Sequence, residues 1–216
     1  MKIDPESRKT DNLKKIIRKR IQKKRDSLSD QIRLTKSKAI AAKFIKLGFY
    51  KDSKKIIAYF PFRSEIDTTI IIRKALRQQK KVLLPRVNGK DLDLYYIKDL
   101  SKDLGPGSFG IMEPVPAECI PASYKDIDLV LIPGVGFDRQ MNRLGYGGGF
   151  YDKLLKILPA DLPRIAIAFD LQIVDSIPIM AHDLKIDIIV TETEIITSNY
   201  YNRTYPAKET IDKKGP

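Results

Sequence analysis

The stretch from residue 131 to residue 155 constrains the fold of this chain more than any other part: it reads LIPGVGFDRQMNRLGYGGGFYDKLL. It begins within an apolar run, residues 129–132, that Pro133 and Gly134 must end, so the run predicts a short buried strand of a parallel sheet. Glycines follow at positions 145, 147, 148 and 149, and residues 150–155 resume a helix-compatible pattern. A strand, a glycine-rich loop and a helix in this order indicate an α/β domain.

The same stretch predicts an anion site. Glycines allow several backbone N–H groups to approach one ligand, and a helix N-terminus behind them adds partial positive charge. Arg143 can add a permanent charge and two parallel donors. Neither the GxxxxGK[ST] phosphate loop nor the dinucleotide-binding fingerprint fits, so a phosphate site here would be of another kind. The alternative is a turn in which the glycines serve tight packing alone.

The run that starts at Pro133, PGVGFDRQMNRLGYGGGFYDKLL, closely resembles the C-terminal motif of 5-formyltetrahydrofolate cyclo-ligases. Three further segments agree with that family in order and spacing: a basic helix at 14–29, FPFRSEIDT at 60–68 and AHDLKID at 181–187. The resemblance covers about residues 10–195. Two positions depart from it. Met141 stands where the family usually has glycine, which puts the shape of that turn in question, and Phe150 replaces a frequent tyrosine.

Apolar runs alternate with helical patterns, which predicts a three-layer α/β/α fold with a mainly parallel sheet. We expect buried strands at 55–60, 81–85, 129–132, 164–169 and 187–191, and an edge or hairpin strand at 93–97. We expect helices after residue 10, from the cap Ser29 to a stop at Gly48, and at 68–79. Residues 104–121, rich in proline and glycine, predict an ordered crossing loop. The resemblance implies a fold similar to that of sugar-phosphate isomerases and CoA transferases.

Length and composition indicate a single domain over residues 1–216, with loose tails at about 1–10 and 200–216. The chain is 43% hydrophobic and 31% charged, which is ordinary for a soluble globular protein. No apolar run approaches the roughly 18 residues of a membrane span, and the N-terminus is charged, so we expect a cytoplasmic protein with no membrane partner. Cys119 is the single cysteine and cannot form an internal disulfide. We expect a monomer.

Positive charge is concentrated near the N-terminus. Residues 1–55 hold 19 Lys and Arg against 6 Asp and Glu, whereas the rest of the chain holds 21 of each, so the net charge of +13 arises there. One helical face carries four polar side chains that can reach a common site: Lys14, Arg18, Gln22 and Arg25. Beside it runs an apolar stripe: Leu13, Ile16, Ile17, Ile21 and Leu28. Such a face can bind nucleic acid or one polyanionic small molecule, or remain solvated.

Three carboxylates are candidate site residues. Glu65 follows the first strand, and ligands collect at the carboxyl ends of strands in open α/β sheets, although a solvated loop acid is the alternative. Asp152 and Asp183 can place two carboxylates near one phosphate site, the oxygen set that Mg²⁺ prefers, although either can be a helix-terminal charge. His182, the single histidine, lies in no nucleophile elbow, so we predict no catalytic triad.

The resemblance implies an enzyme that uses ATP and Mg²⁺ to convert 5-formyltetrahydrofolate, with or without a polyglutamate tail, into 5,10-methenyltetrahydrofolate, ADP and phosphate. It implies catalytic roles for Lys14, Glu65 and Arg143, and Mg²⁺ ligation by Asp152 and Asp183. It places the following residues at the nucleotide: Lys14, Arg18, Arg143, Leu144, Gly145, Tyr146, Gly147, Gly148, Gly149, Phe150 and Tyr151. It places these at the folate: Arg18, Phe60, Glu65, Tyr146, Gly147, Gly148, Gly149 and Phe150. The alternatives are a basic nucleic-acid-binding module, which we do not expect, and a sugar-phosphate or CoA-ester enzyme on the same fold.

Overall fold

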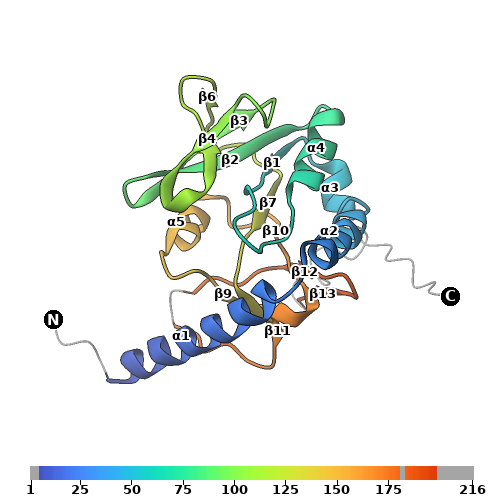
Figure 1. The fold of residues 1–216 in the computed structure, drawn as a ribbon. Coiled ribbons are helices and arrows are strands. Elements are labelled where there is room, and N and C mark those ends of the chain that lie inside the picture. The colour runs from blue at the N-terminus through green and yellow to red at the C-terminus, as the bar shows by residue number, and fades with distance from the viewer. Residues whose placement is uncertain (1–4, 181–182, 199–216) are drawn as a thin grey trace.

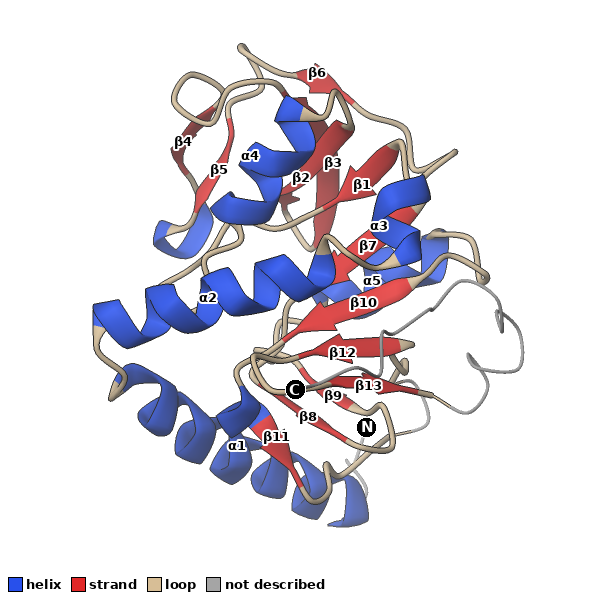
Figure 2. Cartoon of the chain, turned by 90° about the vertical axis from the view of Figure 1, so that its right-hand side faces the viewer, coloured by secondary structure: helices blue, strands red, loops and turns tan. Residues whose placement is uncertain are grey.

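The computed structural model describes residues 5–180 and 183–198, and within them eight strands form one sheet in the order β13-β12-β10-β7-β1-β2-β3-β6 (Figures 1 and 2). The strands are β1 (Lys55–Ile57), β2 (Lys81–Asn88), β3 (Asp91–Ile97), β6 (Ile120–Pro121), β7 (Leu129–Ile132), β10 (Arg164–Ile167), β12 (Ile188–Val190) and β13 (Ile195–Thr197). The five central strands from β12 to β2 are parallel to one another. At one edge β13 pairs antiparallel with β12, and at the other β3 pairs antiparallel with both β2 and β6. The predicted mainly parallel sheet is confirmed.

Helices cover both faces of this sheet. They are α1 (Pro5–Asp26), α2 (Asp30–Phe44), α3 (Gly48–Asp52), α4 (Thr69–Arg77) and α5 (Phe150–Ile157). In β7, Leu129 and Leu131 belong to the buried cluster that includes α2, α3 and α4, whereas Val130 and Ile132 belong to the cluster that includes α5. Because side chains alternate along a strand, these two clusters are the two faces of the sheet, and the predicted three-layer fold is confirmed. The likeness to sugar-phosphate isomerases and CoA transferases stays a prediction.

Local sequence explains most helix boundaries, with two corrections. The Ser29 hydroxyl accepts a hydrogen bond from the Ile32 amide at 3.3 Å and caps α2, as predicted. Gly48 was expected to stop that helix, but α2 ends at Phe44 and Gly48 begins α3, which buries two aromatic side chains. Residues 5–10 were expected to be a loose tail, yet α1 begins at Pro5, where proline's fixed φ suits a first helical turn. Residues 200–216 lie outside the described residues.

Residues 104–121 do not form a simple crossing loop. They contain a hairpin of β4 (Leu104–Pro106) and β5 (Met112–Pro114), a short turn of 3-10 helix at Ser108–Gly110, and the edge strand β6. Proline is tolerated here because the hairpin is only three residues long on each side and the prolines lie at its ends. Among the described residues, no helix combines the length and apolarity that a membrane crossing requires.

The segment between β7 and α5 is also more ordered than a single loop. It forms β8 (Gly136–Asp138) and β9 (Arg143–Leu144), which join β11 (Ile173–Val174) in a three-stranded sheet. The fully buried Asp138 holds the β8–β9 turn, since its carboxylate accepts hydrogen bonds from the amides of Gln140 at 3.0 Å and Asn142 at 2.9 Å. Met141 in this turn has φ 67°, so it adopts a left-handed conformation that glycine would enter without steric cost.

The order of the strands creates a crevice. From β1 the chain moves to β2 on one side, and it later returns to β7 on the other side of β1. The helix that follows β1 is α4 on one face, whereas the helix that follows β7 is α5 on the opposite face. The connections therefore diverge at the carboxyl ends of β1 and β7, which is the position where open α/β sheets bind ligands.

Candidate active site

A cavity of about 690 Å³ opens at this crevice. Its walls come from α1, the loop after β1, β2, the β4–β5 hairpin and the segment between β7 and α5. Every residue with a predicted role lines it: Lys14, Arg18, Phe60, Glu65, Arg143, Leu144, Gly145, Tyr146, Gly147, Gly148, Gly149, Phe150, Tyr151, Asp152 and Asp183. The fold brings them together, and the roles themselves stay predictions.

The basic face of helix α1 lies against the rest of the protein, whereas part of its apolar stripe is exposed to solvent. Lys14 and Arg25 are 6% and 2% exposed, whereas Leu13 and Ile16 are 42% and 64% exposed. Within the apolar stripe, Ile21 is 2% exposed and Ile17 is half-buried, so burial increases toward the carboxyl end of the helix. This part of the helix lies beside the cavity rather than over the apolar core, and the charged side chains of Lys14 and Arg18 find partners there.

Two basic side chains of α1 reach across to distant parts of the chain. Lys14 Nζ donates to Asp183 Oδ2 at 2.5 Å, and Arg18 Nε donates to the carbonyl oxygen of Gly145 at 2.7 Å. The Arg18 guanidinium also lies against Gly147, where a Cβ would be 3.7 Å from Cζ and where φ is 102°. Burial is the main cause that lowers the pKa of Arg18, which remains a cation near neutral pH. Helix α1 and the glycine-rich segment, residues 145–149, thus form one positively charged wall of the cavity.

Arg143 lies behind the glycines. Its Nη2 donates to Asp152 Oδ1 at 2.5 Å and its Nη1 donates to the Pro133 carbonyl oxygen at 3.2 Å, while its buried Nε has no hydrogen-bond partner among the described residues. Gly149 has φ 69° and precedes the first turn of α5, where Asp152 lies. A permanent cation, a helix N-terminus and glycine backbone therefore meet at one place, as the anion-site prediction requires.

Glu65 belongs to a hydrogen-bond network that begins at the buried Arg25 of α1. Its Oε2 accepts from the Phe62 amide at 2.9 Å, and its Oε1 accepts from the Tyr146 hydroxyl. Arg25 Nη1 donates to that same hydroxyl oxygen at 2.9 Å, and Arg25 Nε donates to Ser64 Oγ at 3.0 Å. Because the arginine can only donate, it directs the tyrosine proton toward the carboxylate. Burial raises the pKa of Glu65, and the hydrogen bond from Tyr146 and the charge of Arg25 partly offset that rise.

Asp152 and Asp183 lie on the rim of the cavity, each paired with a cation. Their side chains are 29% and 22% exposed. Among the described residues, no group of three or more His, Cys, Asp or Glu could hold a metal ion. Two carboxylates beside basic side chains nevertheless fit Mg²⁺, which uses one or two carboxylates and takes its other oxygens from phosphate and water.

With the geometry in view, comparisons with known proteins identify the family. The sequence model of the 5-formyltetrahydrofolate cyclo-ligase family matches residues 10–192, which is most of the chain. The chain belongs to this cyclo-ligase family. The predicted membership is therefore confirmed.

Similar proteins carry the family's name. The cyclo-ligase of Mus musculus is 30% identical over 194 residues, which cover 83% of this chain and 93% of the mouse protein. The cyclo-ligase of Haemophilus influenzae is 30% identical over 180 residues, or 81% of this chain and 95% of that protein. A solved structure of 5,10-methenyltetrahydrofolate synthetase from Aquifex aeolicus matches with a TM-score of 0.76 and 35% identity, covering 86% of this chain and 92% of that one.

In this member of the cyclo-ligase family, several cavity residues were not predicted. The hairpin contributes Phe109, Ile111, Met112 and Glu113, and nothing in the sequence linked a segment read as a crossing loop to the site. Arg25 was placed on the polar face of its helix but was given no role. Its spacing of four and seven residues from Ile21 and Arg18 places it on one helical face with them, but only its contacts with Ser64 and Tyr146 show that it is buried beside the cavity.

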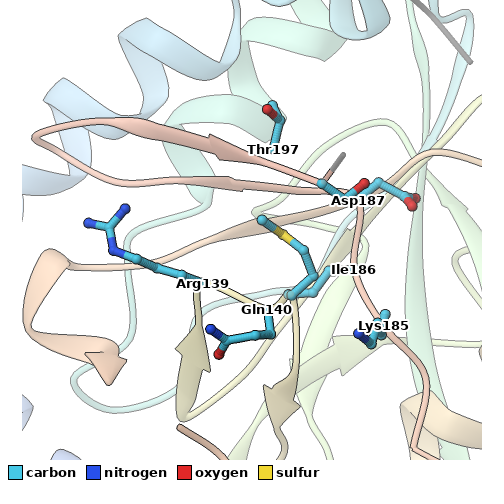
Figure 3. Close-up of a pocket in the computed structure, with 8 residues that line it drawn as sticks. Arg139, Gln140, Lys185, Ile186, Asp187 and Thr197 are labelled. Carbon is cyan, nitrogen blue, oxygen red and sulfur yellow. The ribbon is translucent and has the colours of Figure 1, made fainter. Parts of the chain in front are cut away.

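A second hollow of about 500 Å³ contains none of the residues with a predicted role (Figure 3). It is lined by Arg139, Gln140, Met141, Lys185, Ile186, Asp187, Thr197 and Ser198. Arg139 already pairs with Glu194, its Nη2 lying 2.5 Å from Oε1. The three buried side-chain atoms without a hydrogen-bond partner in the described chain belong to Glu113, Arg143 and Tyr151, which all line the larger cavity instead. Unsatisfied polar atoms therefore favour the larger cavity as the ligand site.

Proposed function

We propose that this chain converts 5-formyltetrahydrofolate and ATP into 5,10-methenyltetrahydrofolate, ADP and phosphate in a Mg²⁺-dependent reaction. The observation that carries the proposal is the single cavity in which a basic helix face, a glycine-rich anion site, two rim carboxylates and Glu65 converge, in a chain of the cyclo-ligase family. The substrate carries a polyglutamate tail in some of its forms, which would extend out of the cavity.

The chemistry explains why ATP is needed. A formamide oxygen is a poor leaving group, so the formyl oxygen first attacks the γ-phosphorus of ATP and ADP departs. The second folate nitrogen then attacks the activated carbon, the carbon–oxygen bond breaks, phosphate leaves with the electron pair, and the nitrogen releases its proton to water. This sequence needs positioning and charge neutralisation more than an acid–base pair.

The phosphate end of the cavity is the wall between α1 and the glycine-rich segment. Lys14 and Arg18 supply charge from the helix, and Arg143 supplies it from behind the glycines. In the structure Lys14 donates to Asp183, Arg18 to the Gly145 carbonyl oxygen and Arg143 to Asp152. Phosphate oxygens would take over these donors, because a charged donor binds a phosphate oxygen more strongly than a carbonyl oxygen.

Asp152 and Asp183 would hold Mg²⁺ once Lys14 and Arg143 turn to the phosphates. The bound ion would neutralise charge on the transferred phosphoryl group. The exchange keeps each carboxylate next to positive charge at every stage, so neither is left unpaired inside the cavity.

The folate end is the wall that carries Glu65, Phe60 and Tyr146. A carboxylate directed into this part of the cavity can accept a hydrogen bond from the folate and stabilise the positive charge that develops on the activated carbon. Arg25 holds Tyr146, and Tyr146 holds Glu65, so the carboxylate is oriented before the substrate binds.

The test is to mix the purified chain with 5-formyltetrahydrofolate and to follow the near-ultraviolet absorbance of methenyltetrahydrofolate. The absorbance should rise only when ATP and Mg²⁺ are both present. No rise under any condition, with tight and steeply salt-dependent binding of RNA or DNA instead, would favour a nucleic-acid module. No rise with turnover of a sugar phosphate or a CoA ester would favour the other alternative. The predicted monomeric state and cytoplasmic location stay predictions.

A further inference from the structure

Glu113 is a buried carboxylate that accepts no hydrogen bond from any described residue. It is 3% exposed, it lies on β5 and it lines the larger cavity. Its Oε2 lies 3.8 Å from Arg86 Nη1, which is too long for a hydrogen bond, and that Nη1 donates instead to the Pro114 carbonyl oxygen at 2.8 Å. A buried carboxylate with one distant cation and no donor from the protein is costly, so a ligand that donates to it would gain binding free energy there.

The surroundings of Glu113 fit a flat ring rather than a phosphate. Apolar side chains line the cavity beside it: Val87, Leu92, Phe109, Ile111, Met112 and Phe150. The rings of Phe109 and Phe150 meet edge to face with centroids 6.3 Å apart, and Phe109 is 71% exposed although it is apolar. An anion among apolar and aromatic groups would repel phosphate, whereas it can accept hydrogen bonds from the N–H edge of a heterocycle.

We propose that Glu113 recognises the pterin ring of the folate substrate, an inference that rests on the proposed function. The 2-amino group and the adjacent ring N3–H of a pterin form two parallel donors, which match the two oxygens of one carboxylate as a guanidinium does. The hydrogen bond to Oε2 would satisfy a buried oxygen that has no hydrogen-bond partner among the described residues. Glu113 would therefore determine which ring the cavity accepts, because a ring without this donor pair would leave the carboxylate buried and unpaired.

The position of Glu113 agrees with this assignment. Figures 1 and 2 place the β4–β5 hairpin and α1 on opposite sides of α5, so the ring would bind at the end of the cavity away from Lys14 and Arg18. Gly107, across the hairpin, leaves room for the carboxylate, since a Cβ there would overlap the Glu113 side chain. The position of the carboxylate therefore depends on glycine at residue 107.

The donor edge also argues against adenine as the bound ring. The amino group of adenine is flanked by ring nitrogens that only accept, so one carboxylate oxygen would face a lone pair. Guanine presents the same donor pair as a pterin, and GTP as phosphate donor is therefore the competing source of this chemistry. The experiment must therefore measure the binding of folate and the binding of nucleotide separately.

Glu113→Gln is the primary variant, because the amide keeps the shape but presents its own donors to the donors of the ring. The affinity for 5-formyltetrahydrofolate, measured by calorimetry, should fall about 10- to 150-fold, as expected for the loss of one charge-assisted hydrogen bond of about 1.5 to 3 kcal/mol. The affinity for p-aminobenzoylglutamate, which lacks the pterin, and the KM for ATP should remain unchanged. Glu118→Gln, at an exposed position five residues away, is the matched control and should change nothing.

Gly107→Ala is a second route to the same result, since it displaces the carboxylate without removing it and φ −122° at this position suits alanine. It should weaken folate binding and leave ATP binding intact. Unchanged folate affinity in Glu113→Gln would overturn the proposal, and so would a loss confined to the use of ATP or GTP. Equal weakening of all ligands with a lower Tm would show a structural role and overturn it as well. A wild-type chain that binds no folate would instead refute the proposed function.

Discussion

Replacing Glu65 by glutamine should disrupt the hydrogen bond that its carboxylate accepts from the Tyr146 hydroxyl. The glutamine has one acceptor oxygen, and the Phe62 amide, 2.9 Å from Oε2 in the wild type, can only donate, so the amide oxygen must stay there. The side-chain NH₂ group then faces the Tyr146 hydroxyl oxygen, which already accepts from Arg25 Nη1 at 2.9 Å. The Tyr146 hydroxyl then has no carboxylate to donate to, and the proposed folate site has lost the negative charge of residue 65.

The size of the effect follows from one charge-assisted hydrogen bond. Such a bond contributes about 1 to 3 kcal/mol, which corresponds to turnover that is roughly 5- to 150-fold slower. The affinity for ATP and Mg²⁺ should stay close to that of the wild type, because Glu65 makes no hydrogen bond to the proposed phosphate and metal groups, which are Lys14, Arg18, Arg143, Asp152 and Asp183. Turnover is measured by methenyltetrahydrofolate absorbance, and nucleotide affinity by calorimetry.

Stability should change in the opposite direction from activity. Burial raises the pKa of Glu65, so the folded chain holds this proton more tightly than the unfolded chain does. Ionised Glu65 therefore opposes folding at pH values above its raised pKa, and this cost disappears below the unfolded pKa. The Tm of Glu65→Gln relative to the wild type should rise as pH increases through that range, while the acid limb of the wild-type activity profile should be missing from the variant.

Two results would refute this reasoning. Unchanged turnover at saturating folate would remove Glu65 from the chemistry. A joint loss of ATP affinity and Tm would show that the residue is structural. Exposed Glu118→Gln serves as the control for a general effect of charge.

Three further changes test other parts of the cavity. Lys14→Ala should raise the KM for ATP by about 10- to 150-fold, the equivalent of one hydrogen bond to a charged group, whereas exposed Lys24→Ala should not, and equal effects would remove Lys14 from the phosphate site. Asp152→Asn should require more Mg²⁺ for activity, and a titration that overlays the wild type would show that Asp152 is no ligand. Met141→Gly should lower stability by about 1 to 4 kcal/mol, because the loss of a buried side chain outweighs relief of its left-handed backbone, and a higher Tm would contradict this.

The sequence was most informative where local and global constraints coincide. The apolar run at 129–132 had to end at Pro133, and the structure ends β7 at Ile132. Glycines before residue 150 had to supply left-handed backbone, and Gly147 and Gly149 have φ of 102° and 69°. The predicted site residues gather in one cavity because most of them follow parallel strands, whose carboxyl ends share one edge of the sheet.

The features of the site that the sequence did not predict depend on contacts between residues that are distant in the chain. Arg25 meets Ser64 and Tyr146, which are 39 and 121 positions away in the chain, and no local pattern encodes such a pairing. Periodicity located the two faces of α1 but could not tell which of them would be buried, because it assumes an apolar interior. Leu13 and Ile16 stay exposed because Lys14 and Arg18 on the same helix face the cavity, and only the tertiary fold reveals that cavity.

Because α1 runs along one edge of the body, the concentration of basic residues in the first 55 positions makes the molecule electrically polar (Figure 1). Lys14 and Arg18 of α1 line the cavity, and the exposed lysines of the same helix face water, so an approaching polyanion would meet an attractive field before it reached the site. The field reaches about 8 to 10 Å at physiological ionic strength, which is longer than any of the contacts that hold the ligand. The outer side of the helix would thus affect the association rate of the ligand, and the inner side its binding strength. Added salt would lower the association rate more than it would raise the dissociation rate.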